Sequence, residues 1–193
     1  MNGKRHGKGT FYFNKSDERE KYIGDYRNDQ RNGFGTLYFK NGRRYEGKFL
    51  FGKFHGKGLY YFKSGDIYEG DFLNDKLHGK GTYTWSSGKK YTGDWKYDKA
   101  TGKGVYYFKS GKKYEGQFVD GKFDGTGTLF YTNGNKYIGE FKEDNRTGNG
   151  IFFFNNGDRY EGEFKDGKKH GKGIYYYKDG RIESGQWQND KMV

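Results

Sequence analysis

The sequence predicts an all-β fold: an elongated single-layer antiparallel sheet of consecutive β-hairpin repeats, forming a twisted ribbon with a groove. Three observations support this prediction. A tyrosine recurs every 23 residues, glycines fall at fixed places in each period, and apolar and polar residues alternate between them. The 20 Tyr, 18 Phe and 3 Trp make up 21% of the 193 residues, and apolar residues as a whole only 31%, so little aliphatic material remains for a conventional core. A thin sheet packed through aromatic rings fits this composition.

The tyrosine period sets the repeat boundaries. Counting the tyrosine as position 1, seven full repeats cover residues 22–182, a partial repeat 1–21 precedes them and a partial repeat 183–193 follows. We therefore expect one array over residues 1–193. All 35 glycines occupy positions 3, 8, 12, 14 and 21, which leaves none for a phosphate-binding loop. The repeating tyrosines are Tyr22, Tyr45, Tyr68, Tyr91, Tyr114, Tyr137 and Tyr160.

Each repeat is predicted to be a hairpin. Positions 1–5 and 12–18 alternate with period two, and turn signals such as Asn41-Gly42 lie between such segments. The expected register pairs position 3 with 14, 1 with 16 and 5 with 12, and the next tyrosine with position 18. Rings at positions 5 and 16 would then lie beside glycines, which explains why glycine recurs within strands.

Composition limits the classes of partner and compartment. The formal net charge of +12 makes anionic partners worth considering, namely nucleic acid, inositol lipids or an acidic protein surface. A solubilising lysine surface is the alternative explanation. The chain has no Cys, no apolar run of membrane-spanning length and no apolar segment after its N-terminus, so we expect an intracellular protein.

The order Tyr-Glu-Gly-x-Phe, then Gly-Lys-x-His-Gly-x-Gly, as in residues 160–180, resembles the MORN (membrane occupation and recognition nexus) repeat. The resemblance covers nearly the whole chain. It implies a groove that binds protein segments or phosphoinositides, and scaffold roles in the cytoplasm or cytoskeleton, including the radial spokes of the cilium or flagellar axoneme. Residues that depart from the tyrosine–glutamate start are Ile23, Thr92, Ile138, Glu183 and Ser184.

The chemistry-bearing residues follow the same period, which argues against an active site. Four histidines, His6, His55, His78 and His170, all occupy position 11, where turn capping is the expected role. Neighbouring repeats lie about 10 Å apart, too far for two such histidines to share a zinc ion. Carboxylates recur at positions 2 and 4, so no unique acid–base pair stands out. We expect no catalytic residue, no metal, no cofactor and no enzyme activity.

The predicted function is a non-enzymatic scaffold or adaptor that binds an extended or helical protein segment in an aromatic- and glycine-lined groove. Packing of these rings on glycines alone is the competing interpretation of the same residues. The alternative function is a peripheral module for anionic phosphoinositide membranes. Acidic rows beside the lysines disfavour nucleic acid. Candidate groove residues are Tyr68, Phe72, Tyr91, Trp95, Tyr114 and Phe118, and candidate lipid contacts are Lys53, Lys76, Lys99 and Lys122.

The outermost strands raise the prospect of self-association. The segments near residues 9–13 and 183–187 are expected to be sheet edges without neighbours in this chain, and unpaired edges favour pairing with another chain. We therefore expect a homo-oligomer formed through these edges, or a partner that covers them. An equally good explanation of the unpaired edges is that the chain is part of a longer protein.

Overall fold

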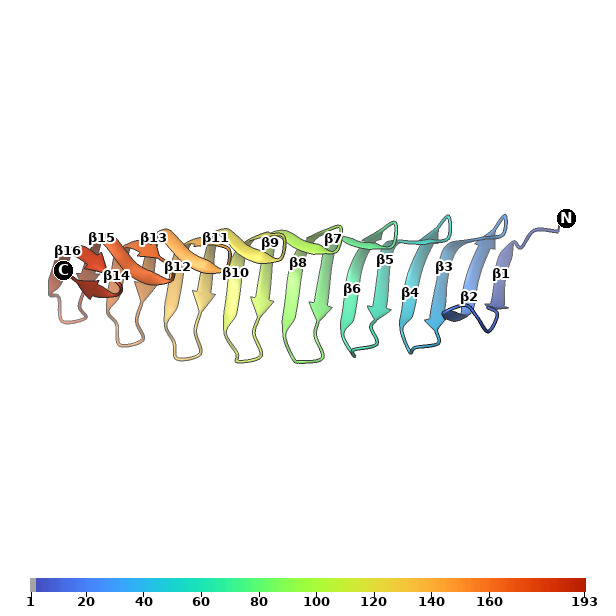
Figure 1. Ribbon diagram of the computed structural model, residues 1–193, viewed down its shortest axis with the longest axis horizontal. Coiled ribbons are helices and arrows are strands. Elements are labelled where there is room, and N and C mark those ends of the chain that lie inside the picture. The colour runs from blue at the N-terminus through green and yellow to red at the C-terminus, as the bar shows by residue number, and fades with distance from the viewer. Residues whose placement is uncertain (1–2) are drawn as a thin grey trace. The chain divides into compact units, whose positions relative to one another are not determined.

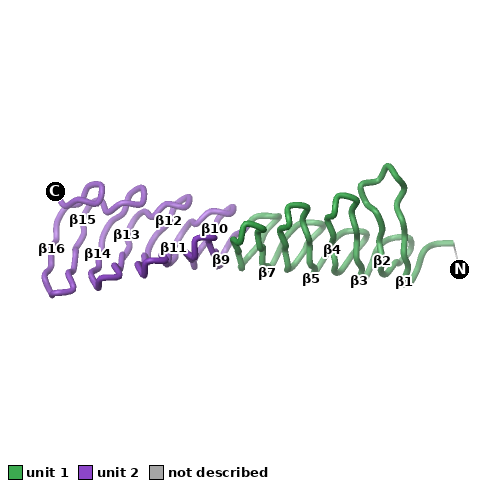
Figure 2. The backbone as a smooth tube through the Cα atoms, turned by 90° about the horizontal axis from the view of Figure 1, so that it is seen from below, with its two compact units in different colours: residues 1–99 green, residues 100–193 purple. Residues whose placement is uncertain are grey.

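The structure is a computed structural model that describes residues 3–193 in two compact units, residues 1–99 and 100–193 (Figure 2). Each unit consists of antiparallel strands that follow one another in chain order (Figure 1). No helix occurs within residues 3–193, and accordingly none there could span a membrane. The all-β prediction of consecutive hairpins is therefore confirmed.

Successive strands form the first and then the second arm of each hairpin repeat. The first unit contains β1 (Gly7–Tyr12), β2 (Arg19–Arg27), β3 (Gln30–Phe39), β4 (Arg44–Leu50), β5 (Lys53–Tyr61), β6 (Ile67–Leu73), β7 (Lys76–Thr84) and β8 (Lys90–Lys96). From the unit boundary onward follow β9 (Lys99–Tyr107), β10 (Lys113–Val119), β11 (Lys122–Phe130), β12 (Lys136–Lys142), β13 (Asn145–Phe153), β14 (Arg159–Lys165), β15 (Lys168–Tyr176), β16 (Ile182–Gln188) and β17 (Lys191–Met192).

A two-residue turn joins the two arms of each repeat. Positions 7 and 8 both have positive φ, for example 50° at Asn74 and 68° at Asp75, as in the type I′ turns that match strand twist. The second strand consequently begins at position 9, three residues earlier than the alternation predicts. A longer loop connects consecutive repeats, where the N–H of position 18 bonds to the carbonyl of position 22, as Phe62 does to Asp66. Gly65 at position 21 has φ of 85° in this loop.

The register agrees with the prediction in part. Tyr45 pairs with Tyr60 and Gly47 with Gly58, so the expected pairs 1–16 and 3–14 are confirmed. The expected pair 5–12 is wrong, because Phe49 pairs with Phe54 at position 10. The pairing between repeats is also wrong.

The next tyrosine lies opposite position 16 instead of 18, as in Tyr60–Tyr68, and Gly58 pairs with Gly70. Gly58 thus has a position 3 glycine on both sides, Gly47 and Gly70, and such glycines form a line across the paired strands within each unit.

A β-bulge at positions 11–13 explains the first difference. The glycine at position 12 adopts positive φ there, 60° at Gly79, a conformation that a side chain disfavours. The position 4 side chain lies against this glycine, and where it is a carboxylate or an amide, as at Asp71 and Gln117, its oxygen accepts the N–H of position 13. Lys80 N donates to Asp71 Oδ2 at 3.0 Å, and Asn149 N to Glu140 Oε1 at 2.8 Å. The carboxylates at position 4 therefore have a structural role in capping the bulge.

The tyrosine at position 1 lies over the glycine line. A Cβ built on Gly58 would lie 2.5 Å from Tyr45 Cε2, and one on Gly47 would lie 2.6 Å from the Tyr45 hydroxyl. The hydroxyl of each repeating tyrosine donates to the carbonyl of position 4, at 2.8 Å from Tyr45 to Lys48 O. The other six make the same bond at 2.9–3.1 Å. The ring that needs the glycines is thus the tyrosine, and not the rings at positions 5 and 16.

These tyrosines form the centre of the core. All seven are at most 1% exposed. Tyr45 meets Phe49 and Phe72 edge-on at 5.1 and 5.0 Å between centroids, while Phe54 from position 10 stacks on it at 3.8 Å. Edge-to-face contacts of this kind add stability beyond burial alone. Phe123 stacks on Tyr114 in the same way, at 3.9 Å, so in these two repeats a ring next to the hairpin tip closes the core.

Burial of these phenols predicts alkaline unfolding. Burial raises the pKa of Tyr22, Tyr114 and Tyr160 from 10.0 to about 12. A raised pKa means that the stabilisation is fully present below pH 10 and is lost as the pH rises through about 12. We expect tyrosinate absorbance and loss of the β-sheet circular dichroism signal to appear together in that window. Titration of most tyrosines near pH 10 with an intact sheet would contradict this expectation.

Adjacent repeats are joined by contacts between position 8 of one repeat and position 10 of the repeat before it. Where position 8 is Asp, its carboxylate accepts the position 10 N–H: Phe54 N donates to Asp75 Oδ1 at 2.8 Å. At Gly52 and Gly167, the position 8 carbonyl accepts an arginine: Arg31 Nη2 donates to Gly52 O at 2.6 Å, and Arg146 makes the same bond to Gly167. Gly121 faces Ala100 and is joined to it by a backbone hydrogen bond, from Gly121 N to Ala100 O at 2.8 Å. Two side-chain solutions therefore serve the same junction.

Candidate binding surfaces

The six predicted groove residues lie within the core. In the first unit, Tyr68, Phe72, Tyr91 and Trp95 are 0%, 4%, 1% and 7% exposed; in the second, Tyr114 and Phe118 are 0% and 2% exposed. They pack against one another and against rings from the neighbouring repeats of the same unit, as Tyr68 does with Phe72 and Trp95. Within each unit they form the support beneath the aromatic face, which we define as the face that carries the position 1 tyrosines.

Partly exposed rings on that face come instead from positions 16 and 18. In the first unit the buried Tyr60 and the partly exposed Phe62, Tyr83 and Trp85 are in contact in that order, with centroids 4.6, 5.2 and 4.6 Å apart. We call this set the first aromatic ladder. The hydroxyl of Tyr83 donates to Asp66 Oδ2 at 3.0 Å, and Asp66 also accepts the N–H of Ser86, so a loop of the preceding repeat orients the ladder.

The second unit repeats the arrangement. Phe152, Phe154, Tyr175 and Tyr177 form a second aromatic ladder with centroid distances of 4.7, 5.5 and 4.6 Å. Asp158 accepts the Tyr175 hydroxyl at 2.9 Å, as Asp66 does for Tyr83. All four rings are partly exposed. The same geometry thus occurs once in each unit.

An open groove adjoins each ladder. The groove in the first unit has a volume of about 360 Å³ and is lined by ladder rings, by Phe54 and Leu77 of position 10, and by the carboxylates of Asp75 and Asp98. The groove in the second unit has about 250 Å³.

Its lining includes Arg146, Lys169 and Asp190, so it is more cationic. Lys169 Nζ lies 4.0 Å from the centroid of the Trp187 ring, and burial lowers its pKa. Each groove has a wall of aromatic rings, but the charged side chains that line the two grooves differ.

Sequence reasoning missed the ladders although their rings are visible in the period. Strand alternation treats positions 1, 5, 16 and 18 as equal members of one face. In two repeats Phe54 and Phe123 at position 10 help to bury the tyrosine, because each stacks on its own tyrosine, at 3.8 and 3.9 Å. The signal in these repeats is an aromatic residue within the segment that the alternation predicts to be a turn.

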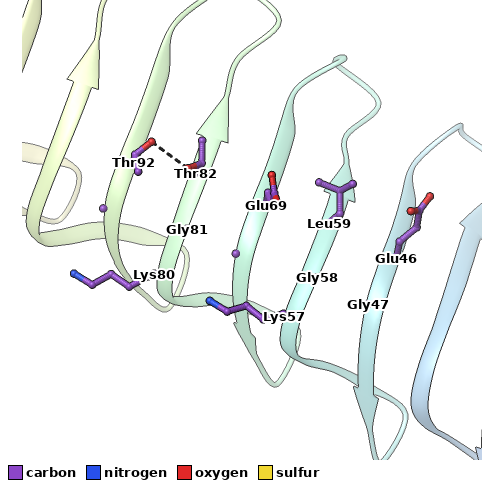
Figure 3. A pocket seen from close by; sticks show the side chains of 12 residues that line it. Glu46, Gly47, Lys57, Gly58, Leu59, Glu69, Lys80, Gly81, Thr82 and Thr92 are labelled. Carbon is purple, nitrogen blue, oxygen red and sulfur yellow. Dashed lines mark hydrogen bonds between the residues drawn. The ribbon is translucent and has the colours of Figure 1, made fainter.

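The opposite, charged face of the first unit holds a larger groove of about 860 Å³ (Figure 3). Its floor is the glycine line, including Gly58, Gly70 and Gly81. Lys57 and Lys80 lie on one side of this line, and Glu46, Leu59, Glu69, Thr82 and Thr92 on the other. Lys57 pairs with Asp71 at 2.9 Å and Lys80 with Asp94 at 2.5 Å.

Comparison with known families accounts for these repeats. The model of the MORN repeat matches eight segments, residues 1–18, 22–43, 45–67, 68–90, 91–113, 114–136, 137–159 and 160–180. The chain belongs to the MORN-repeat family. A search of curated protein sequences finds no match to this MORN protein.

Among solved structures, the MORN chain resembles the SAS-4 (dCPAP) TCP domain of Drosophila melanogaster, solved in complex with a proline-rich motif of Ana2 (dSTIL). The identity is 14%, the TM-score is 0.50, and the match covers 81% of this chain and 85% of that one. The TCP10 domain of Danio rerio CPAP with a STIL peptide matches at 18% identity and a TM-score of 0.33, over 80% of each chain. At these identities the likeness shows the fold alone.

The lysines proposed for lipid contact lie at the start of the second strand of each MORN hairpin, next to the turn. Lys53, Lys76, Lys99 and Lys122 are all exposed. Lys76 Nζ lies 2.7 Å from Asp98 Oδ2, and Lys122 Nζ lies 3.6 Å from Glu143 Oε2. These ion pairs partly neutralise the lysine rows.

The histidines of the MORN repeats lie at the bulge. His6 matches the capping role, because its Nδ1 accepts the N–H of Asn28 at 3.4 Å. The buried Nδ1 atoms of His55 and His78 have no hydrogen-bond partner within residues 3–193, so these atoms cap no turn. Within residues 3–193 no three His, Asp or Glu side chains are grouped as metal ligands would be.

The expected edge strands differ from one another. β1 is exposed along its whole length and, within the described residues, pairs with β2 alone. The strand at residues 183–187, expected to lack a neighbour, lies in β16 and is partly covered, because Trp187 pairs with Met192 and Gln188 with Lys191 of β17. Association through these edges stays a prediction.

Proposed function

We propose that this MORN protein is a non-enzymatic adaptor that binds an extended, proline-containing segment of a protein partner along the aromatic ladders. The observation that carries the proposal is the run of contacting, partly exposed rings beside an open groove in a protein with only 31% apolar residues. Exposed aromatic grooves bind polyproline segments, because such segments are already extended and lose little entropy on binding.

The side chains around the first ladder suit this kind of ligand. Phe62, Tyr83 and Trp85 offer ring faces, while Asp75 adds negative charge at the groove wall, where Asp98 is already paired with Lys76. A segment that combines prolines with a basic residue would therefore match the first groove. The proline-rich motif in the SAS-4 complex is a property of that protein, and it supports the choice of ligand class for this fold.

The six core rings are proposed to act indirectly. Tyr68, Phe72, Tyr91 and Trp95 fix the ladder above them in the first unit, and Tyr114 and Phe118 pack in the same way in the second. Their substitution would weaken binding by disturbing the fold. The family resemblance supports a cytoskeletal or ciliary assembly as the setting, and localisation of the tagged protein in its native cell tests that part.

The experiment is binding of synthetic proline-rich peptides, with and without a basic residue, followed by nuclear magnetic resonance of the full chain. We expect Phe62→Ala and Trp85→Ala each to weaken binding about tenfold, as expected for aromatic anchors. Tyr107→Ala is the matched control, because this exposed ring lies at position 17 on the charged face. Circular dichroism checks that each variant is folded.

Equal binding by folded ladder variants and the parent protein would overturn the proposal. The lipid function is the competing outcome, favoured by Phe51, which is 68% exposed at a hairpin tip close to Lys53. Sedimentation with phosphoinositide vesicles distinguishes it. Membrane binding lost on reversing Lys53, Lys76 and Lys99, without peptide binding, would support the lipid function instead.

A further inference from the structure

A three-residue cluster recurs on the charged face. It consists of a cation at position 23, a ring at position 17 of the paired strand and a carboxylate at position 2 of the cation's own strand. Arg44 Nε lies 2.6 Å from Glu46 Oε1, and its guanidinium lies 4.1 Å from the Tyr61 centroid. The same arrangement joins Lys113, Phe130 and Glu115, and also Arg159, Tyr176 and Glu161. Each carboxylate therefore has its own cation, held over a ring.

One repeat has the carboxylate without the cation and the ring. In the repeat that begins at Tyr68, position 2 is Glu69, but position 23 is Ile67 and position 17 is Thr84. Ile67 and Thr84 lie directly opposite one another, as the cation and ring do elsewhere. Glu69 is exposed and has no ion pair or hydrogen bond within residues 3–193. Of the four carboxylates Glu46, Glu115, Glu161 and Glu69, the first three each have a cation from position 23, and Glu69 does not.

The open cluster lies within the 860 Å³ groove of the charged face (Figure 3). Glu69 stands between Leu59 and Thr82, its direct neighbours on the two adjacent strands. The other charged side chains of the groove are already neutralised: Glu46 by Arg44, Lys57 by Asp71 and Lys80 by Asp94. The unpaired charge of the groove is therefore the single negative charge of Glu69, which favours a cationic ligand.

The geometry points to a second docking site, for a protein segment that inserts an arginine side chain beside Glu69. The arginine takes the place that Arg44 and Arg159 occupy in the complete clusters, with its guanidinium on the Glu69 carboxylate and its apolar stem along Ile67 and Thr84. Arginine suits the place because its planar fork matches a carboxylate and its stem packs on apolar surface. This site lies on the face opposite the aromatic ladder and goes beyond the function proposed above.

The groove can hold more than one side chain. It extends from β4 to β8, and five strands about 4.8 Å apart span roughly 19 Å. An extended segment of about six residues has that length. The glycine floor lets the backbone of such a segment approach closely, since no side chain projects there. The arginine gives the segment its specificity and the glycine line gives it room.

The test uses the full chain and acetylated six-residue peptides of alanine and serine that carry one central Arg, Lys, Gln or Glu. Nuclear magnetic resonance titration should show the Arg peptide shifting the amides of Leu59, Glu69 and Thr82 at least about fivefold more strongly than the Gln peptide. Glu69→Gln should abolish this difference. The pair Ile67→Arg with Thr84→Tyr, which completes the cluster internally, should block the Arg peptide while keeping the fold.

Matched controls separate this site from the ladder. Glu161→Gln removes a carboxylate of a complete cluster and should leave Arg-peptide binding unchanged. Phe62→Ala should also leave it unchanged, so loss of ladder binding does not count against this site. Equal binding of the Arg and Gln peptides, or full binding by the folded Ile67→Arg, Thr84→Tyr variant, would overturn the inference. Equal preference for Lys would retain the cation site and reject its selectivity for arginine.

Discussion

Gly58→Ala should be among the most damaging single-methyl changes in the protein. The new Cβ would lie 2.5 Å from the Cε2 and hydroxyl of Tyr45 and 2.7 Å from its Cζ. The ring is fully buried and held by its bond to Lys48 O, so it has nowhere to move. Overpacking of this kind costs about 3 kcal/mol of unfolding free energy. Urea unfolding followed by circular dichroism measures the loss.

Gly9→Ala is the matched control because Gly9 occupies the same repeat position in β1. No atom lies within 4 Å of a Cβ built there, and its φ is not positive. Since alanine restricts the unfolded chain more than glycine does, we expect a gain of up to about 0.5–1 kcal/mol. Equal effects at Gly58 and Gly9 would show that backbone freedom, and not the tyrosine, explains these glycines.

Tyr45→Ala should have a similar or larger effect, about 3–5 kcal/mol, because it removes a fully buried ring that stacks on Phe54 and meets Phe49 and Phe72. Tyr45→Phe should cost about 1–2 kcal/mol, the loss of the hydroxyl bond to Lys48 O. In a repeat array the damage should centre on the neighbouring hairpins. Hydrogen exchange of amides in β3 to β6 would locate it.

A double mutant makes this expectation sharper. Once Tyr45 is Ala, the added methyl at residue 58 has space, so Gly58→Ala should cost almost nothing in that background. The coupling free energy between the two sites should therefore approach the whole cost of Gly58→Ala, about 3 kcal/mol. Additive effects would mean that the ring and the glycine do not depend on each other.

The period of the sequence was enough to predict the hairpins, because tyrosine, glycine and alternation repeat together. It could not predict the bulge. Positions 12 and 14 are both glycine, and a residue without a side chain gives no sign of which face it belongs to. Gly79 belongs with Asp71 on the far side of the bulge, while Gly81 lies under Tyr68. The alternation pattern treats the two alike.

The candidate site was predicted less well for a related reason. Choosing position 1 and 5 rings such as Tyr114 and Phe118 required knowledge of what covers them, which is Phe123. The cover is position 10, which reads as part of a turn until the two-residue turn at positions 7 and 8 is known. The alternation of apolar and polar residues shows on which face of the sheet a ring lies. The exposure of that ring depends on whether a residue next to the hairpin tip packs on it, as Phe54 does on Tyr45.

The junctions between positions 8 and 10 limit how such an array can grow. Asp75 suits Phe54 because the carboxylate caps a backbone N–H, whereas Gly52 suits Arg31 because its carbonyl receives the guanidinium. The pair straddles two repeats, so a duplicated or deleted segment of 23 residues keeps a side-chain bond at its new junction unless a glycine at position 8 faces a residue other than arginine, as Gly121 faces Ala100. A change in the number of repeats therefore depends on the contacts between two hairpins as well as on the hairpin itself.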